Sequence, residues 1–285
     1  MIKIKIYRSR RIREEKTGGL NNIQQHNLNF LLQNSYPGST SRGQGDTITG
    51  NFAEDIMNQR FEKTGDFDLY DKEENIPNEQ TIAKELVQVI PSLKSNKITK
   101  AITGASFGKI FELDNNHILK LFLGGVNPKE DIKWYKKNQK MMFSGHHKKN
   151  TSLIPIYGEP NWGNLLPSFP DVEVGHVEMA KFIPLDDYFK SSGLGEGDTI
   201  IAHSLALFKS LYDKNKNLKW IKSEIQNFLA GANPDAIEPF NQKQFMSLIE
   251  AFHTMLSMGF DLTDIADRNM AVLEQDKNNI VIFDR

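Results

Sequence analysis

Two pairs of short apolar runs, each pair joined by a polar turn, constrain the fold of this 285-residue chain most strongly. The first pair comprises residues 109–113 and 118–122, separated by Asp114, Asn115, Asn116 and His117. The second pair comprises residues 270–273 and 280–283, separated by six mostly polar residues. Short apolar runs around turn-forming residues are typical of β-hairpins. We therefore expect one hairpin in the middle of the chain and another near its end.

Helical periodicity dominates much of the rest of the chain after residue 76. Apolar residues such as Ile82, Leu86 and Ile90 recur at the spacing of one helix face. The pattern predicts helices over residues 77–93, 128–143, 199–212, 218–229 and 242–258, and further strands around 153–157 and 174–182. Strands early and helices late predict an α+β fold with two lobes, a strand-rich N-lobe (77–182) and a short helical C-lobe (183–285).

The first 76 residues differ in composition from the rest of the chain. Ile2, Ile4 and Ile6 alternate with polar residues, as in a strand with one buried face, and an arginine-rich stretch comes next. Residues 16–50 are poor in apolar side chains, so we expect them to stay mobile. We predict a partly disordered extension with a boundary near 76–77, in which residues 1–16 bind a protein partner. The alternative is that the same strand pairs within the chain's own sheet; nucleic-acid binding is less favoured, because no aromatic residues interleave the basic ones.

Composition excludes several classes of protein. The chain has no cysteine, which excludes disulfides and Cys-ligated zinc, and its net charge of −1 does not favour a nucleic-acid coat. No apolar stretch approaches the length that a bilayer requires, so no membrane association is predicted. We expect a cytoplasmic protein, or a virion-associated one if a bacteriophage encodes it.

A glycine-bearing turn precedes the first hairpin. Gly104 and Gly108 flank three small or apolar residues, Ala105, Ser106 and Phe107, in a stretch between two strand-like runs. Exposed N–H groups in such a turn can bind phosphates, although an ordinary hairpin turn is the simpler interpretation. The spacing does not match a Walker P-loop, which needs four residues between its glycines and a Ser or Thr after the lysine.

Downstream of this turn, Lys120 lies in the second strand of the hairpin, with Ile118 and Phe122 on its own face. A lysine on an apolar strand face is costly unless it meets an anion. An exposed edge strand would remove that cost, so both interpretations stay open.

Oxygen-bearing side chains lie around the second hairpin. Asn269 directly precedes its first strand, Asp284 directly follows its second, and Asp264 lies five residues before Asn269. An antiparallel hairpin brings Asn269 and Asp284 to the same end, where they could hold Mg²⁺. The alternative is that Asp and Asn only mark turns.

In this order, the glycine turn, Lys120, Asp264 with Asn269, and Asp284 resemble the signature of the protein-kinase-like superfamily, which includes small-molecule phosphotransferases. The resemblance covers about two-thirds of the chain and extends faintly to kinase-like proteins encoded by bacteriophages. It implies an ATP-dependent phosphotransferase with an ATP–Mg²⁺ site.

The resemblance also implies a set of site residues. Gly104, Ser106, Phe107 and Gly108 would cover the phosphates, and Lys120 would contact them. Asp264 would be the catalytic base, and Asn269 and Asp284 the metal ligands. Glu178, Met179 and Ala180 would form the hinge that meets adenine. Glu130 would pair with Lys120, although Glu130 equally fits a capping box with Asn127 at the start of the next helix.

The sequence departs from the family pattern at several positions. Thr103 and Ala105 stand at two loop positions where the family has glycine, and Ala266 replaces the Lys or His two positions after the catalytic Asp. The sequence ends at Arg285, one residue after Asp284, which predicts a minimal C-lobe. The alternative prediction is therefore a catalytically impaired pseudokinase that serves as a binding or structural module.

Overall fold

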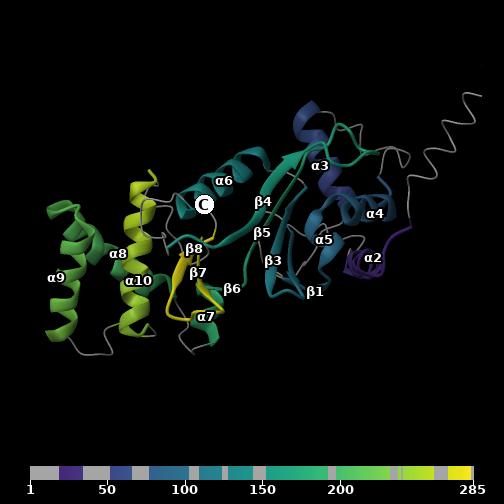
Figure 1. The fold of residues 1–285 in the computed structure, drawn as a ribbon. Coiled ribbons are helices and arrows are strands. Elements are labelled where there is room, and N and C mark those ends of the chain that lie inside the picture. The colour runs from purple at the N-terminus through teal and green to yellow at the C-terminus, as the bar shows by residue number, and fades with distance from the viewer. Residues whose placement is uncertain are drawn as a thin grey trace, which may run out of the picture. The chain divides into compact units, whose positions relative to one another are not determined.

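The computed structural model describes residues 19–34, 52–65, 77–102, 109–123, 128–143, 152–191, 197–231, 237–238, 240–259 and 269–283 (Figure 1). The chain divides into two compact units, Met1–Ile132 with Asn161–His176, and Lys133–Pro160 with Val177–Arg285. Both helices and antiparallel strands are present, so the predicted α+β class is confirmed.

The larger sheet has the strand order β1-β2-β3-β5-β4. Its strands are β1 (Ile98–Ile102), β2 (Lys109–Leu113), β3 (His117–Phe122), β4 (Ile156–Gly163) and β5 (Val174–Ala180). β2 pairs with β3 antiparallel, so the first predicted hairpin is confirmed. Asn116 in its turn has a φ of 64°, a left-handed conformation that asparagine tolerates better than most residues.

In the described part of the first unit, four helices pack on one face of this sheet. They are α2 (Asn22–Asn34), α3 (Phe52–Thr64), α4 (Glu79–Val89) and α5 (Pro91–Ser95), and Figure 1 shows α4 and α5 beside the first strands. Alternate strand residues share a face, so Phe111, Leu119 and Leu121 point to the same side. They share a core with Ile56 of α3 and Leu86 of α4.

The helix predicted over 77–93 is two helices. Ile90 has an extended conformation, with φ −78° and ψ 117°, and Pro91 begins the second helix. The residue before a proline avoids the helical region, because the proline ring crowds its backbone. Ile82, Leu86 and Ile90 are all buried, as the periodicity predicts.

Part of the segment predicted to be mobile is a helix whose inner face packs in the core of the first unit. The Asn27 side chain of α2 is fully buried, donates to the carbonyls of Leu93 and Asn96 (2.9 and 2.8 Å), and accepts from the N–H of Ile98 (2.7 Å). Leu28 and Leu31 of the same helix join the core. The expectation that residues 22–34 are mobile was wrong. The amide side chain of Asn27 binds backbone groups of the same unit rather than water. The sequence boundary near 76–77 falls inside this unit.

The second unit contains a small sheet and a group of helices. Its strands are β6 (Phe182–Pro184), β7 (Met270–Leu273) and β8 (Ile280–Ile282), all antiparallel, so the second predicted hairpin is confirmed. The helices are α7 (Leu185–Ser191), α8 (Gly197–Lys214), α9 (Leu218–Gly231) and α10 (Gln242–Ser257). The helix α6 (Pro128–Phe143) has its first five residues in the first unit and the rest in the second.

Helix α10 is fixed to the β7–β8 hairpin by hydrogen bonds. A capping box joins Asn241 and Gln244 at its start, and the Gln244 amide also donates to the carbonyl of Lys277 (2.7 Å). The Ser247 hydroxyl accepts from the N–H of Ile280 (2.9 Å). Polar side chains of one helix therefore hold the hairpin that carries the predicted metal ligands at its other end.

Within the described part of the chain, no helix is long and apolar enough to cross a membrane.

Candidate functional site

Lys120 is a buried lysine on the middle strand of the larger sheet. Its side chain is only 2% exposed, and its neighbours on the same face of the hairpin, Ile118, Phe122 and Ile110, are buried as well. The ammonium group lies 4.9 Å from the centre of the Phe122 ring. A ring face attracts a cation but supplies much less free energy than an anion. Because Lys120 is buried on the middle strand, the alternative that it lies on an exposed edge strand is excluded.

A second buried lysine lies on the opposite face of the same hairpin. Lys109, the first residue of β2, pairs with Asp55 of α3 at 2.6 Å and lies 5.2 Å from the centre of the Phe52 ring. Burial raises the pKa of Asp55, and the charge and hydrogen bond of Lys109 oppose that rise. Sequence analysis missed this pair, because Asp55 lies in a segment for which no helix was predicted.

Glu79 adds a second carboxylate to this cluster. Its Oε1 accepts from the N–H of Ala53 at 2.6 Å, which links the start of α3 to the start of α4. Its Oε2 is buried and has no hydrogen-bond partner among the described residues. Burial raises the pKa of Glu79, and the hydrogen bond from Ala53 opposes it.

Helix α6 begins with two adjacent acidic residues, Glu130 and Asp131. Glu130, the predicted partner of Lys120, lies exposed in the first turn, whereas Asp131 is 9% exposed. A buried carboxylate is the better candidate to balance a buried lysine, because its charge is less screened by water. Adjacent residues of a helix face different directions, so a shift of one position decides which carboxylate is buried.

The end of the second hairpin brings Asn269 beside Phe283. The N–H of Phe283 donates to the Asn269 carbonyl at 3.1 Å, and the Tyr135 hydroxyl donates to the Phe283 carbonyl at 3.0 Å. The Phe283 ring stacks on that of Phe182, with 4.4 Å between ring centres. Asn269 is therefore fixed next to the residue that directly precedes Asp284.

The predicted hinge lies at the end of β5. Met179 and Ala180 are buried, and Glu178 is half-buried. The N–H of Ala180 donates to the carbonyl of Pro155 at 2.8 Å. An adenine contact at Ala180 would therefore use its carbonyl rather than its N–H.

Several predicted site residues lie outside the described residues: Gly104, Ser106, Phe107, Gly108, Asp264 and Asp284, as do residues 1–16. The flanking residues of the glycine turn are described. Ile102 ends β1 and pairs with Ile110 of β2, so the predicted strand-like runs on either side of residues 103–108 are neighbouring antiparallel strands.

A surface groove of about 500 Å³ lies elsewhere in the second unit, lined by Gln226, Gln242, Lys243, Met246, Ser247, Glu250, Asp276, Asn278 and Asn279. It adjoins the turn of the β7–β8 hairpin, the end opposite Asn269. Its lining is mostly amide and charged side chains without aromatic rings, and we do not assign it to the predicted site. Among the described residues, no group of three His, Asp or Glu side chains is placed to hold a metal ion.

No protein-family model matches the sequence, and no curated protein is significantly similar to it.

Proposed function

We propose that this chain is an ATP-binding, kinase-like phosphotransferase that transfers the γ-phosphoryl group to an acceptor. The observation that carries the proposal is the burial of Lys120 on the middle strand of the sheet, downstream of the glycine-bearing turn. A buried ammonium group is a strong binding site for an anion, since little water competes for it. In the protein-kinase-like superfamily that the sequence resembles, the lysine on the corresponding strand contacts the α- and β-phosphates of ATP.

The second hairpin supports the same proposal independently. Asn269 offers a carboxamide oxygen at the hairpin end, and Asp284 follows Phe283 in the sequence. Oxygen donors of these two kinds suit Mg²⁺, so Asn269 and Asp284 would hold the ion. When bound, Mg²⁺ would neutralise charge on the phosphate groups.

The other residues would have positioning and proton-transfer roles. Asp264 would accept the proton of the acceptor group, and the turn from Gly104 to Gly108, with Ser106 and Phe107, would cover the phosphates. Glu178, Met179 and Ala180 would contact the adenine. Asp131, which is buried, replaces Glu130 as the carboxylate that we propose would pair with Lys120.

A pseudokinase that binds nucleotide without transferring phosphate is the second candidate. Ala266 favours it, because the superfamily usually has a Lys or His at that position to assist the transferring phosphoryl group. Such a chain would serve as a binding or structural module.

Transfer of label from [γ-³²P]ATP, to the chain itself and to proteins of a host lysate, tests the proposal. We expect transfer by the wild-type chain and its loss in Asp264→Asn, with MgATP binding retained, because the base is needed for transfer rather than for binding. Binding without any transfer would favour the pseudokinase, and equal transfer by Asp264→Asn would exclude Asp264 as the base.

A further inference from the structure

Helix α3 contacts both strands of the β2–β3 hairpin, which carries Lys120, and it does so at one end of that hairpin. Lys109 begins β2 and pairs across the hairpin with Leu121, and Leu123 directly follows β3. Lys109 and Leu123 therefore both lie at the end of the hairpin away from its turn. Asp55 of α3 binds the first of these residues, and Gln59 of α3 binds the second.

The contact to β2 is a short, largely buried ion pair. The Asp55 carboxylate lies 2.6 Å from the Lys109 ammonium, and the two side chains are 26% and 9% exposed. The start of α3 is itself fixed, because the N–H of Ala53 donates to Glu79 of α4. An ion pair in so little water holds its two groups more firmly than a surface pair does.

The contact to β3 uses the buried amide of Gln59. Its Nε2 donates to the carbonyls of Leu123 (3.0 Å) and Glu173 (2.8 Å), and its Oε1 accepts from the N–H of Glu173 (2.6 Å). Glu173 directly precedes β5, the neighbour of β3 in the sheet. One side chain thus joins the ends of two adjacent strands.

We infer that Asp55 is a positioning residue for nucleotide binding, acting through Lys109 on the hairpin that carries Lys120. Lys120 is adjacent to Leu121, the cross-strand partner of Lys109, so a displacement of this end of the hairpin displaces Lys120 as well. Asp55 and Lys109 lie on the face opposite Lys120 and need not touch the nucleotide. This inference rests on the proposed function and extends it to a helix for which the superfamily resemblance makes no prediction.

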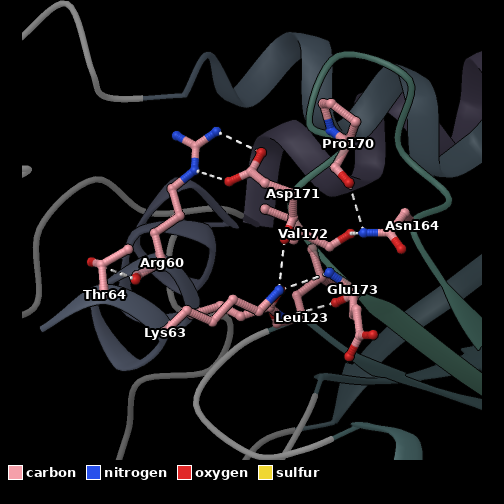
Figure 2. A network of polar contacts seen from close by, with 10 residues as sticks. Arg60, Lys63, Thr64, Leu123, Asn164, Pro170, Asp171, Val172 and Glu173 are labelled. Atoms are coloured by element: carbon pink, nitrogen blue, oxygen red, sulfur yellow. Dashed lines mark hydrogen bonds and ion pairs between the residues drawn. The ribbon is translucent and has the colours of Figure 1, made fainter.

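The same helix supplies a matched control one turn further on. Arg60 forms two hydrogen bonds with Asp171 (2.6 and 3.1 Å), and Lys63 donates to the Asp171 carbonyl (2.6 Å), as Figure 2 shows. These contacts tie α3 to the segment before β5 rather than to the β2–β3 hairpin. Arg60→Gln therefore loosens α3 without releasing Lys109.

The experiment measures two properties of the full chain: MgATP affinity by titration calorimetry, and hydrogen exchange of the hairpin amides, residues 109–123, without nucleotide. The variants are Asp55→Asn, Arg60→Gln and the double variant Asp55→Leu/Lys109→Met. Asp55→Asn leaves Lys109 without the Asp55 carboxylate. The double variant instead replaces both charged side chains by apolar ones, and an apolar pair of similar volume often replaces a buried ion pair without loss of stability.

We expect Asp55→Asn to weaken MgATP binding about tenfold and to speed exchange in the hairpin, because a lost ion pair frees one strand end. Arg60→Gln should change neither property, and the double variant should recover most of both. Wild-type affinity and exchange in Asp55→Asn would overturn the inference. Equally weak binding in the double variant would overturn it too, since Lys109 would then act on the nucleotide directly. No saturable binding by the wild-type chain would overturn the proposed function instead, and the exchange data would still decide whether Asp55 holds the hairpin.

Discussion

Lys109 and Lys120 lie on opposite faces of the same hairpin. Lys109 pairs with Leu121 and Ile110 pairs with Lys120, and successive pairs of an antiparallel ladder point to alternate faces. The face of Lys109 is covered by α2, α3, α4 and α5, where Asp55 neutralises it. Two buried lysines eleven residues apart therefore serve different purposes, Lys109 in holding the fold and Lys120 in the proposed binding of phosphate.

Replacement of Lys109 by Met should destabilise the first unit. The change leaves the Asp55 carboxylate, already desolvated, without its partner cation, and we expect a loss of about 2 kcal/mol in the free energy of unfolding. Lys100→Met, at an exposed position of β1, is the control and should change stability by about 0.5 kcal/mol or less. Urea unfolding of both variants measures the difference; equal stability of the two would show that the Asp55–Lys109 pair is energetically neutral.

Replacement of Asn27 by Leu should be costly in spite of the added apolar volume. The change leaves a buried carbonyl, a half-buried carbonyl and a buried N–H of the α5–β1 segment without their partner, which we expect to cost about 3 kcal/mol. Asn29→Leu, an exposed change two residues away on α2, should be nearly neutral. Thermal unfolding separates the two variants, and a stable Asn27→Leu chain would mean that α2 is not required by the core.

Because Leu28 and Leu31 of α2 are part of the core, deletion of residues 1–50 should also destabilise the first unit.

The raised pKa of Glu79 predicts a specific dependence of the free energy of unfolding on pH. Its pKa is raised in the folded chain, so the folded state holds the Glu79 proton more tightly than the unfolded state does. Its stabilising contribution is therefore complete below about pH 4.5 and is lost as the pH rises through the folded pKa. Glu79→Gln keeps an acceptor for the Ala53 N–H and removes this titration, so its stability relative to wild type should increase from pH 5 to pH 8.

Urea unfolding at pH 5 and pH 8 tests this prediction. Glu62→Gln, an exposed change on α3, corrects for the loss of one acidic residue. A difference between Glu79→Gln and wild type that is the same at both pH values would contradict the assignment.

The adjacent acidic residues of α6 provide a paired test of the Lys120 site. Asp131→Asn should weaken MgATP binding about tenfold, whereas Glu130→Gln should leave it unchanged, because only Asp131 is buried. Both variants remove one negative charge, so the comparison isolates position. Titration with MgATP measures both, and the reverse order would restore Glu130 as the partner of Lys120.

The hairpins and most of the helices could be predicted because local signals determine them. Apolar runs around Asp- and Asn-containing turns predicted both hairpins, and helical periodicity predicted α6, α8, α9 and α10. The break at Ile90–Pro91 was missed, although the proline itself is a signal for it.

The N-terminal helices could not be predicted from composition. The side chains that fix them, Asn27 in α2 and Gln59 in α3, resemble those of a polar linker until their backbone partners are known. Those partners lie 64 to 114 residues away in the sequence. The Asp55–Lys109 pair is hidden in the same way, since its two residues belong to separate elements that only the folded chain brings together.

Calorimetric titration with MgATP of the wild-type chain and of Lys120→Met tests the central claim most directly. We predict saturable binding by the wild-type chain and a loss of at least about tenfold in affinity, about 1.4 kcal/mol, in Lys120→Met. Lys100→Met should bind like wild type, since its side chain is exposed on β1. A wild-type chain that shows no saturable heat of binding, or a Lys120→Met chain that binds MgATP as tightly as wild type, would contradict the proposed nucleotide site.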